Sequence, residues 1–204
     1  SSTQAEMREI FSIYGEIPFP PYIENNEVDH NRYQTVYAQN ENSVAAPTAG
    51  LHITKEIIDR CSGVGASVVT VNLNVGIGTF QPISTDSIDE HVMHSERYSV
   101  EDDVWETIQK AKRVIAVGTT VVRTLESVAS SGRLEGRTEL YIKPGFQFRV
   151  VNSLLTNFHL PKSSLLVMIE AFMGKDWKNL YDLALKEGYR FLSFGDAMFI
   201  ERDR

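Results

Sequence analysis

ASVVTVNLNVGIGT (residues 66–79) and VIAVGTT (residues 114–120) are two apolar, β-branched runs that each lead into glycine and threonine. Runs of this composition predict buried strands, and the segments after residues 54, 99 and 120 have the period of amphipathic helices. Strands that alternate with helices indicate an α/β domain. We therefore expect a three-layer α/β/α-type sandwich around a mixed, largely parallel sheet.

Cap residues and apolar periodicity predict the other elements. Helices are expected at residues 54–62, after Ser99 to about residue 111, from residue 120 to 129, from Ser163 to about residue 174 and at 176–187, with a short one after Asp29. Strands are expected at residues 138–143, 146–151 and 190–200. Residues 1–15 are predicted to form a short lead-in helix, and residues 16–204 the main α/β catalytic domain.

Composition excludes several classes of protein. A hydrophobic content of 42% with 23% charged residues is that of a globular chain rather than a disordered one. The single cysteine, Cys61, cannot form an internal disulfide, and no apolar run reaches the ~20 residues of a membrane helix. We expect a cytoplasmic monomer with no membrane partner. The net charge of −7 means that contact with nucleic acid would require a local basic patch.

The two glycine-containing turns after the expected strands are candidate ligand-binding loops. Ligands of open α/β sheets bind beyond the carboxyl ends of the strands, where glycine lets the backbone approach a ligand and helix amides favour anions. The turns can equally be tight strand exits. The first resembles a methyltransferase glycine loop only weakly, because Phe80 stands where a third glycine would fall. The residues concerned are Gly76, Gly78, Thr79, Gly118, Thr119 and Thr120.

His91 and His94 lie three positions apart between Glu90 and Glu96. On a helix this spacing would place both imidazoles on one face, where a carboxylate could tune them for acid–base chemistry. A solvated helix end is the structural alternative. A metal site is a further alternative, although the spacing is not that of H-E-x-x-H.

His52 and His159 lie in loops at helix entrances, and Asp196 follows a glycine inside an apolar run. Each of these three residues has a functional and a structural interpretation of similar weight. Cys61 is interpreted as an inert thiol, because only Arg60 beside it is basic.

Taken together, the motifs resemble the S-adenosylmethionine:tRNA ribosyltransferase-isomerases of queuosine biosynthesis. The resemblance extends from Gly15 to Ile200 in one consistent order. The matching segments are PFPPYI (18–23), RYQTVYA (32–38), SVAAPTAGLH (43–52), VGIGTFQP (75–82), EHVMHSE (90–96), VGTTVVRTLES (117–127), TNFHLPKSS (156–164) and YRFLSFGDAMFI (189–200).

The resemblance implies a reaction. The ribosyl part of S-adenosylmethionine moves to the aminomethyl group of a deazaguanine at the wobble position of a tRNA, giving epoxyqueuosine with release of adenine and methionine. It implies tRNA and S-adenosylmethionine as partners, and neither a metal nor another cofactor.

The same resemblance and the chemistry of the reaction together suggest site residues. The catalytic candidates are His91, His94, Glu96, His52 and Asp196. Arg123 and Lys162 are candidates for binding a carboxylate or a tRNA phosphate. The remaining substrate-binding candidates are Thr48, Gly50, Gly76, Gly78, Thr79, Gly118, Thr119, Thr120, Asn157 and His159.

The chain departs from the family pattern in three ways. Asn74 stands where the family usually has histidine, and asparagine cannot transfer a proton at neutral pH. Val121 replaces a serine, and we expect the family's preceding region, including a small inserted β-barrel domain, to be absent from this chain. A non-catalytic binding module and a conventional methyltransferase therefore stay open as alternatives.

Overall fold

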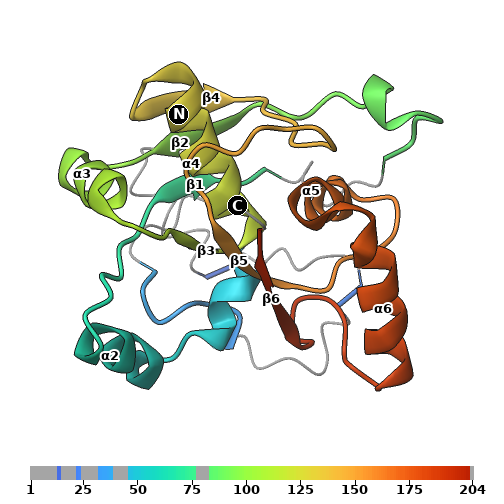
Figure 1. Cartoon of the computed structure of the whole chain (residues 1–204), viewed down its shortest axis with the longest axis horizontal. Coiled ribbons are helices and arrows are strands. Elements are labelled where there is room, and N and C mark those ends of the chain that lie inside the picture. Colours follow the sequence, from blue (N-terminus) through green and yellow to red (C-terminus); the bar gives the residue numbers. More distant parts are fainter. Residues whose placement is uncertain (1–12, 15–21, 24–31, 39–45, 77–82, 203–204) are drawn as a thin grey trace.

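A computed structural model describes residues 13–14, 22–23, 32–38, 46–76 and 83–202 of the chain (Figure 1). Its helices are α2 (Lys55–Gly63), α3 (Asp102–Lys110), α4 (Thr119–Ser131), α5 (Ser164–Met173) and α6 (Trp177–Lys186). Short 3₁₀ helices are η2 (Thr48–His52), η4 (Ile88–Glu90) and η5 (Gly174–Asp176). The strands are β1 (Asn72–Asn74), β2 (Glu96–Ser99), β3 (Ile115–Val117), β4 (Glu135–Thr138), β5 (Ser153–Asn157) and β6 (Ala197–Glu201).

The described strands form two sheets of three. In the first, β2 lies between β1 and β4 and pairs antiparallel with both. In the second, the central strand β5 pairs parallel with β3 and antiparallel with β6. The parallel register aligns Val117 with Leu155, so β3 and β5 end at the same edge.

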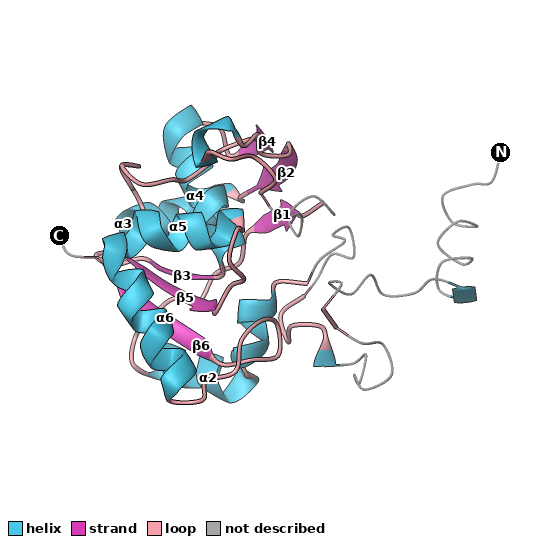
Figure 2. Ribbon diagram, turned by 90° about the vertical axis from the view of Figure 1, so that its right-hand side faces the viewer, coloured by secondary structure: helices cyan, strands magenta, loops and turns pink. Residues whose placement is uncertain are grey.

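Helix α4 lies between the two sheets (Figures 1 and 2). It contacts β3 and β5 on one side and β1 and β4 on the other. Its apolar residues Val122 and Leu125 are at most 2% exposed and belong to the main core, while Val128 packs with Tyr98 of β2. Helices α5 and α6 pack side by side against the same main core.

The expected α/β class is confirmed, with a mixed second sheet. The sheets differ from the expectation in that the described strands form two of them, and only the β3–β5 pair is parallel. Strand pairing joins residues far apart in the sequence, so local composition does not determine it. The helices α2, α3, α4, α5 and α6 are confirmed within a few residues, and the side chains of Thr54 and Ser163 cap α2 and α5 as predicted.

Several local predictions are wrong. The buried strand expected at residues 66–75 is reduced to β1, and Val68 and Val69 are 48% and 40% exposed. Ser99 ends β2 instead of capping α3, whose N-cap is Glu101. The hairpin expected at residues 138–151 keeps only its Pro144-Gly145 turn, because residues 141–152 form no strand. The central strand β5 was not predicted.

Two expectations fall mainly on residues that are not described. Of the lead-in helix at residues 1–15, Ile13 and Tyr14 are described, and both are helical. The domain boundary at residue 16 and most of the short helix after Asp29 lie outside the described residues. Within the described part of the chain, no helix combines the length and apolarity needed to cross a membrane.

Glu126 is a fully buried carboxylate on α4 that binds the loop before β5. Its Oε2 accepts a hydrogen bond from the backbone N–H of Arg149 at 2.8 Å. Its Oε1 accepts two more, from Val150 and Val151, each at 3.0 Å. This one side chain therefore satisfies three donors of a loop that has no sheet partners.

We predict that Glu126→Ala lowers the free energy of unfolding by about 3 kcal/mol or more, because each buried donor left unpaired costs ~1–3 kcal/mol. Urea denaturation measures this change. Glu106→Ala is the matched control, since Glu106 forms an exposed pair with Lys110 and its loss should cost about 0.5 kcal/mol or less. Equal losses in the two variants would contradict the role assigned to Glu126.

Candidate active site

Three chemically distinctive residues meet at one edge of the second sheet. Gly118 follows the end of β3, Asn157 ends the parallel strand β5, and Asp196 directly precedes the antiparallel strand β6. Asn157 pairs with Ala197, the first residue of β6. The carboxyl ends of β3 and β5 thus coincide with the start of β6, at the edge where ligands of α/β sheets bind.

A hydrogen-bonded chain links this edge to η2. The Thr48 hydroxyl donates to Asn157 Oδ1 at 3.3 Å, so the opposite side of the amide is its NH₂ group. Asn157 Nδ2 lies 3.1 Å from His52 Nε2. Because an amide nitrogen can only donate, His52 Nε2 must accept, which leaves the ring proton on Nδ1. Asn157 therefore fixes the tautomer of His52.

Close packing at two glycines holds η2 near the start of α4. Gly118 has a φ of 96°, which favours glycine, and its N–H donates to Leu155 O at 2.8 Å. A Cβ on Gly118 would lie 3.8 Å from Ala49 Cβ, so the two segments are in contact. A Cβ on Gly50 would overlap the Tyr37 hydroxyl. Backbone conformation and close packing therefore explain Gly118 and Gly50, and ligand binding would be an additional role for them.

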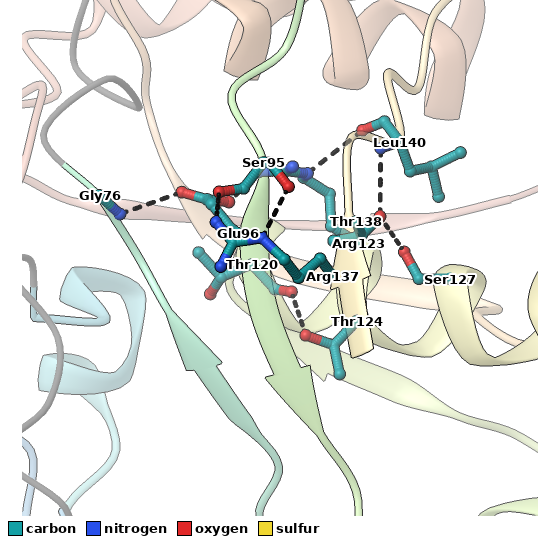
Figure 3. A network of polar contacts seen from close by, with 10 residues as sticks. All are labelled: Gly76, Ser95, Glu96, Thr120, Arg123, Thr124, Ser127, Arg137, Thr138 and Leu140. Carbon is teal, nitrogen blue, oxygen red and sulfur yellow. Dashed lines mark hydrogen bonds and ion pairs between the residues drawn. The ribbon is translucent and has the colours of Figure 1, made fainter. Parts of the chain in front are cut away.

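A second polar group surrounds the ion pair between Glu96 and Arg123 (Figure 3). The two side chains are 2% and 4% exposed, and Arg123 Nη1 donates to Glu96 Oε2. The other oxygen, Oε1, accepts from the backbone N–H of Gly76 at 3.2 Å. Arg123 Nε donates to Leu140 O at 3.2 Å. The pair therefore joins β2, the segment after β1, α4 and the segment after β4.

Hydroxyl groups on α4 and β4 support the position of Leu140 (Figure 3). Ser127 and Thr138 hydrogen bond through their hydroxyls at 2.6 Å, and Thr138 Oγ1 accepts from Leu140 N at 3.1 Å. Both Ser127 and Thr138 are buried. Leu140 O is thereby held in place for the guanidinium of Arg123.

A small cavity lies beside Arg123 at the start of α4. It has a volume of about 10 Å³, close to that of one water molecule, and Thr119, Thr120, Arg123 and Tyr141 are among its lining residues. The ring of Tyr141 meets that of His91 edge to face, with centroids 5.4 Å apart. Burial, followed by the charge of Asp89, raises the pKa of Tyr141. Hence His91 is connected to the first turn of α4 through one aromatic ring.

The prediction that His91 and His94 share a helix face is wrong. His91 ends η4, and residues 91–95 form neither helix nor strand before β2 begins. His91 and Met93 are half-buried there, whereas Val92 and His94 are exposed. In extended chain, residues three apart point to opposite sides, so only His91 faces the cavity region.

Asp196 is paired with Arg190. Its carboxylate accepts from Arg190 N at 2.7 Å and from Arg190 Nη2 at 2.8 Å. These hydrogen bonds are the main reason that the pKa of Asp196 lies below its usual value, and His52 adds a smaller electrostatic contribution. Asp196 thus stays ionised at neutral pH and is a weak proton acceptor.

His159 and Lys162 lie on the loop between β5 and α5. His159 Nε2 hydrogen bonds with Thr156 Oγ1 at 3.1 Å, and its backbone N–H donates to the Tyr181 hydroxyl at 3.0 Å. Burial lowers the pKa of His159 to about 4. Lys162 is exposed with a left-handed φ of 57°, and its carbonyl accepts from Ile83 N at 2.8 Å.

The remaining predicted positions divide between described and undescribed residues. Gly78 and Thr79 lie outside the described residues, as does Phe80. Asn74 is exposed at the end of β1, and Val121 packs against the main core. Among the described residues, no group of three or more His, Cys, Asp or Glu side chains is placed to hold a metal ion.

Sequence reasoning missed Tyr141, Leu140 and Met93, which line the cavity with Arg123. Residues 138–143 have the apolar alternation of a strand, so the sequence predicted a strand here. The structure instead has a loop that contributes the carbonyl of Leu140 and the hydroxyl of Tyr141 to the site. Met93 occupies the inward position between His91 and His94. No signal in the sequence separates these residues from ordinary core residues.

The chain matches known proteins over almost its whole length. The family model described as queuosine biosynthesis protein matches residues 2–200. An S-adenosylmethionine:tRNA ribosyltransferase-isomerase from Carboxydothermus hydrogenoformans is 50% identical over 207 residues, covering 98% of this chain and 61% of the relative. The protein of the same name from Natranaerobius thermophilus is also 50% identical, covering 97% of this chain and 60% of the relative.

A crystal structure of S-adenosylmethionine tRNA ribosyltransferase from Thermotoga maritima is similar to this fold, with a TM-score of 0.62 and 39% identity. The match covers 74% of this chain and 51% of that one. The chain spans about three fifths of the length of the curated relatives it matches.

We predict that His159 makes stability depend on pH. The unfolded imidazole takes up a proton near pH 6.5 and the folded one near pH 4, so the unfolded state binds more protons between these values. Stability is therefore lost as pH falls through this window, by about 3 kcal/mol in total. Unfolding free energies of the wild type and His159→Gln, measured from pH 7 to 4, should converge as pH falls.

His94→Gln is the control for this measurement, because His94 is exposed and should keep the wild-type dependence on pH. If the difference between wild type and His159→Gln stays constant from pH 7 to 4, the buried neutral state of His159 is excluded.

Proposed function

The chain belongs to the queuosine biosynthesis protein family, and from this premise we propose that it is the α/β part of an S-adenosylmethionine:tRNA ribosyltransferase-isomerase. Its substrates are then S-adenosylmethionine and a tRNA that carries an aminomethyl-deazaguanine at the wobble position. The ribosyl group moves to the aminomethyl nitrogen, and adenine and methionine leave. The observation that carries the proposal is the convergence of η2, the ends of β3 and β5, and the His91–Tyr141 pair on the first turn of α4.

The start of α4 is our proposed site for S-adenosylmethionine. Its N-cap is Gly118, which offers no side chain, and its first turn carries no acidic residue. The free amides of such a turn favour an anionic group. Thr119 and Thr120 add hydroxyls beside the cavity. We assign Gly76, Gly78 and Thr79 to the same ligand, because Gly76 lies across Glu96 from Arg123.

Proton transfer falls to His91 and His52 in this proposal. The sulfonium acidifies the neighbouring ribose carbon, so the reaction needs a base there and an acid for the departing adenine. His91 is half-buried beside the cavity, and His52 has a fixed tautomer with its proton on Nδ1. An imidazole can act as a general acid or base, whereas the amide of Asn74 cannot replace a histidine in this task.

Glu96 and Asp196 are proposed as positioning residues. The carboxylate of Glu96 is occupied by Arg123 and the Gly76 amide, and that of Asp196 by Arg190. Glu96 would act by orienting the guanidinium of Arg123, and Asp196 by stabilising the positive charge that His52 gains when it takes up a proton during the reaction. Gly50, Thr48 and Asn157 hold His52 and η2 against the sheet edge.

Contact with tRNA requires positive charge on a chain whose net charge is −7. Lys162 is exposed on the loop that follows β5, close in sequence to Asn157, and we propose that it contacts a phosphate. The neutral imidazole of His159 stabilises this loop through its hydrogen bond with Thr156. Because tRNA modification takes place where tRNA is used, we propose the cytoplasm as its location.

Product analysis tests the proposed reaction. We predict that the chain, incubated with precursor-bearing tRNA and labelled S-adenosylmethionine, releases adenine and methionine. Release of S-adenosylhomocysteine would instead identify a methyltransferase. Binding of S-adenosylmethionine without any release of adenine would identify a binding module.

A pair of histidine variants tests the proton-transfer assignment. We predict that His91→Gln slows adenine release by ~10²–10⁴-fold, the usual contribution of a general acid or base, without a matching loss of folding stability. His94→Gln makes the same chemical change at an exposed site and should slow the reaction far less. A larger loss in the His94 variant would transfer the role to His94.

A further inference from the structure

The buried guanidinium of Arg123 has one nitrogen without a partner. Its Nε and Nη1 donate to Leu140 O and Glu96 Oε2, while Nη2 is inaccessible to solvent and has no hydrogen-bond acceptor among the described residues. Folded proteins rarely leave a buried donor of this kind unsatisfied. The Nη2 donor therefore needs an acceptor from outside the described residues.

A second unpaired donor borders the same cavity. The hydroxyl of Tyr141 is buried and, among the described residues, forms no hydrogen bond. Tyr141 and Arg123 both line the cavity of about 10 Å³ at the start of α4. Two residues that each carry an unpaired donor therefore lie beside one cavity of about the size of a water molecule.

The first turn of α4 adds positive potential to this cavity. Thr119 and Thr120 line it, Gly118 provides no capping side chain, and no acidic residue lies in the first turn. The charge of Arg123 itself is balanced by Glu96. The helix terminus and the two donors together favour an oxygen that carries negative charge and no hydrogen.

We propose that this cavity binds one carboxylate oxygen of the methionyl end of S-adenosylmethionine, with Arg123 Nη2 and the Tyr141 hydroxyl as donors. The inference rests on the proposed function, because it takes S-adenosylmethionine as the ligand. The carboxylate is the only group of that molecule that offers anionic oxygens, whereas its ribose hydroxyls also carry hydrogens.

The walls of the cavity favour a carboxylate attached to an aliphatic chain over a tRNA phosphate at this position. Apart from Ser164, the other walls are apolar and include Met93, Leu165 and Met168, which suit an aliphatic chain. Tyr141 therefore becomes a substrate-binding residue that selects for an α-carboxylate.

Calorimetric titration of three probes tests this assignment. The probes are S-adenosylmethionine, its decarboxylated analogue and free methionine, each titrated into the wild type and Tyr141→Phe. We expect the wild type to bind S-adenosylmethionine about tenfold or more tightly than the analogue, and Tyr141→Phe to weaken only the carboxylate-bearing probes by about tenfold. Removal of an unpaired hydroxyl should not lower stability, which thermal unfolding checks.

Tyr189→Phe is the matched control, because Tyr189 is 50% exposed and does not line the cavity. It should leave the affinity for all three probes unchanged. Equal affinity of the wild type for S-adenosylmethionine and its analogue, or equal weakening of both by Tyr141→Phe, would overturn the carboxylate site and leave the proposed function standing.

The same titrations also distinguish a failure of the proposed function from a failure of the carboxylate site. If S-adenosylmethionine does not bind but methionine binds and loses affinity in Tyr141→Phe, the carboxylate site stands and the proposed function falls. If none of the three probes binds to the wild type, both are overturned.

Discussion

Helix α4 buries two charged side chains because it lies between two sheets and has no face left for solvent. Arg123 is 3% exposed and Glu126 is fully buried. Buried charges are costly unless hydrogen bonds and opposite charges compensate them, so neighbouring segments must supply those partners. Glu126 binds the loop before β5, and Arg123 binds Glu96 of β2 and the carbonyl of Leu140. The charges of one helix thereby fix the positions of both sheets.

The two ends of α4 differ in how many of their buried polar groups have hydrogen-bond partners. Toward its carboxyl end, Glu126 accepts three backbone hydrogen bonds. Toward its amino end, Gly118 offers no cap, and Arg123 Nη2 and the Tyr141 hydroxyl have no partner among the described residues. Each unsatisfied group costs ~1–3 kcal/mol in a folded protein. Local violations of this kind concentrate at functional sites, where a ligand compensates them.

The sheet edge next to this helix brings together groups from separate parts of the chain. The parallel pairing of β3 and β5 aligns Gly118 with the end of β5, and the antiparallel β6 returns Asp196 to the same edge. Asn157 then joins this edge to His52 of η2. The ligand site that we propose at the start of α4 would adjoin both this edge and the ion pair of Glu96 and Arg123.

The sequence by itself determined the α/β class, the helices α2 to α6 and the family. Helix caps such as Thr54 and Ser163, and the order of the glycine, threonine and histidine segments, are local signals that a single chain displays directly. The tertiary structure alone decided how the strands pair, that His91 and His94 face opposite ways, and that Tyr141 lines the cavity. Strand pairing and burial depend on contacts between residues distant in sequence, and the local periodicity of a segment does not specify these contacts.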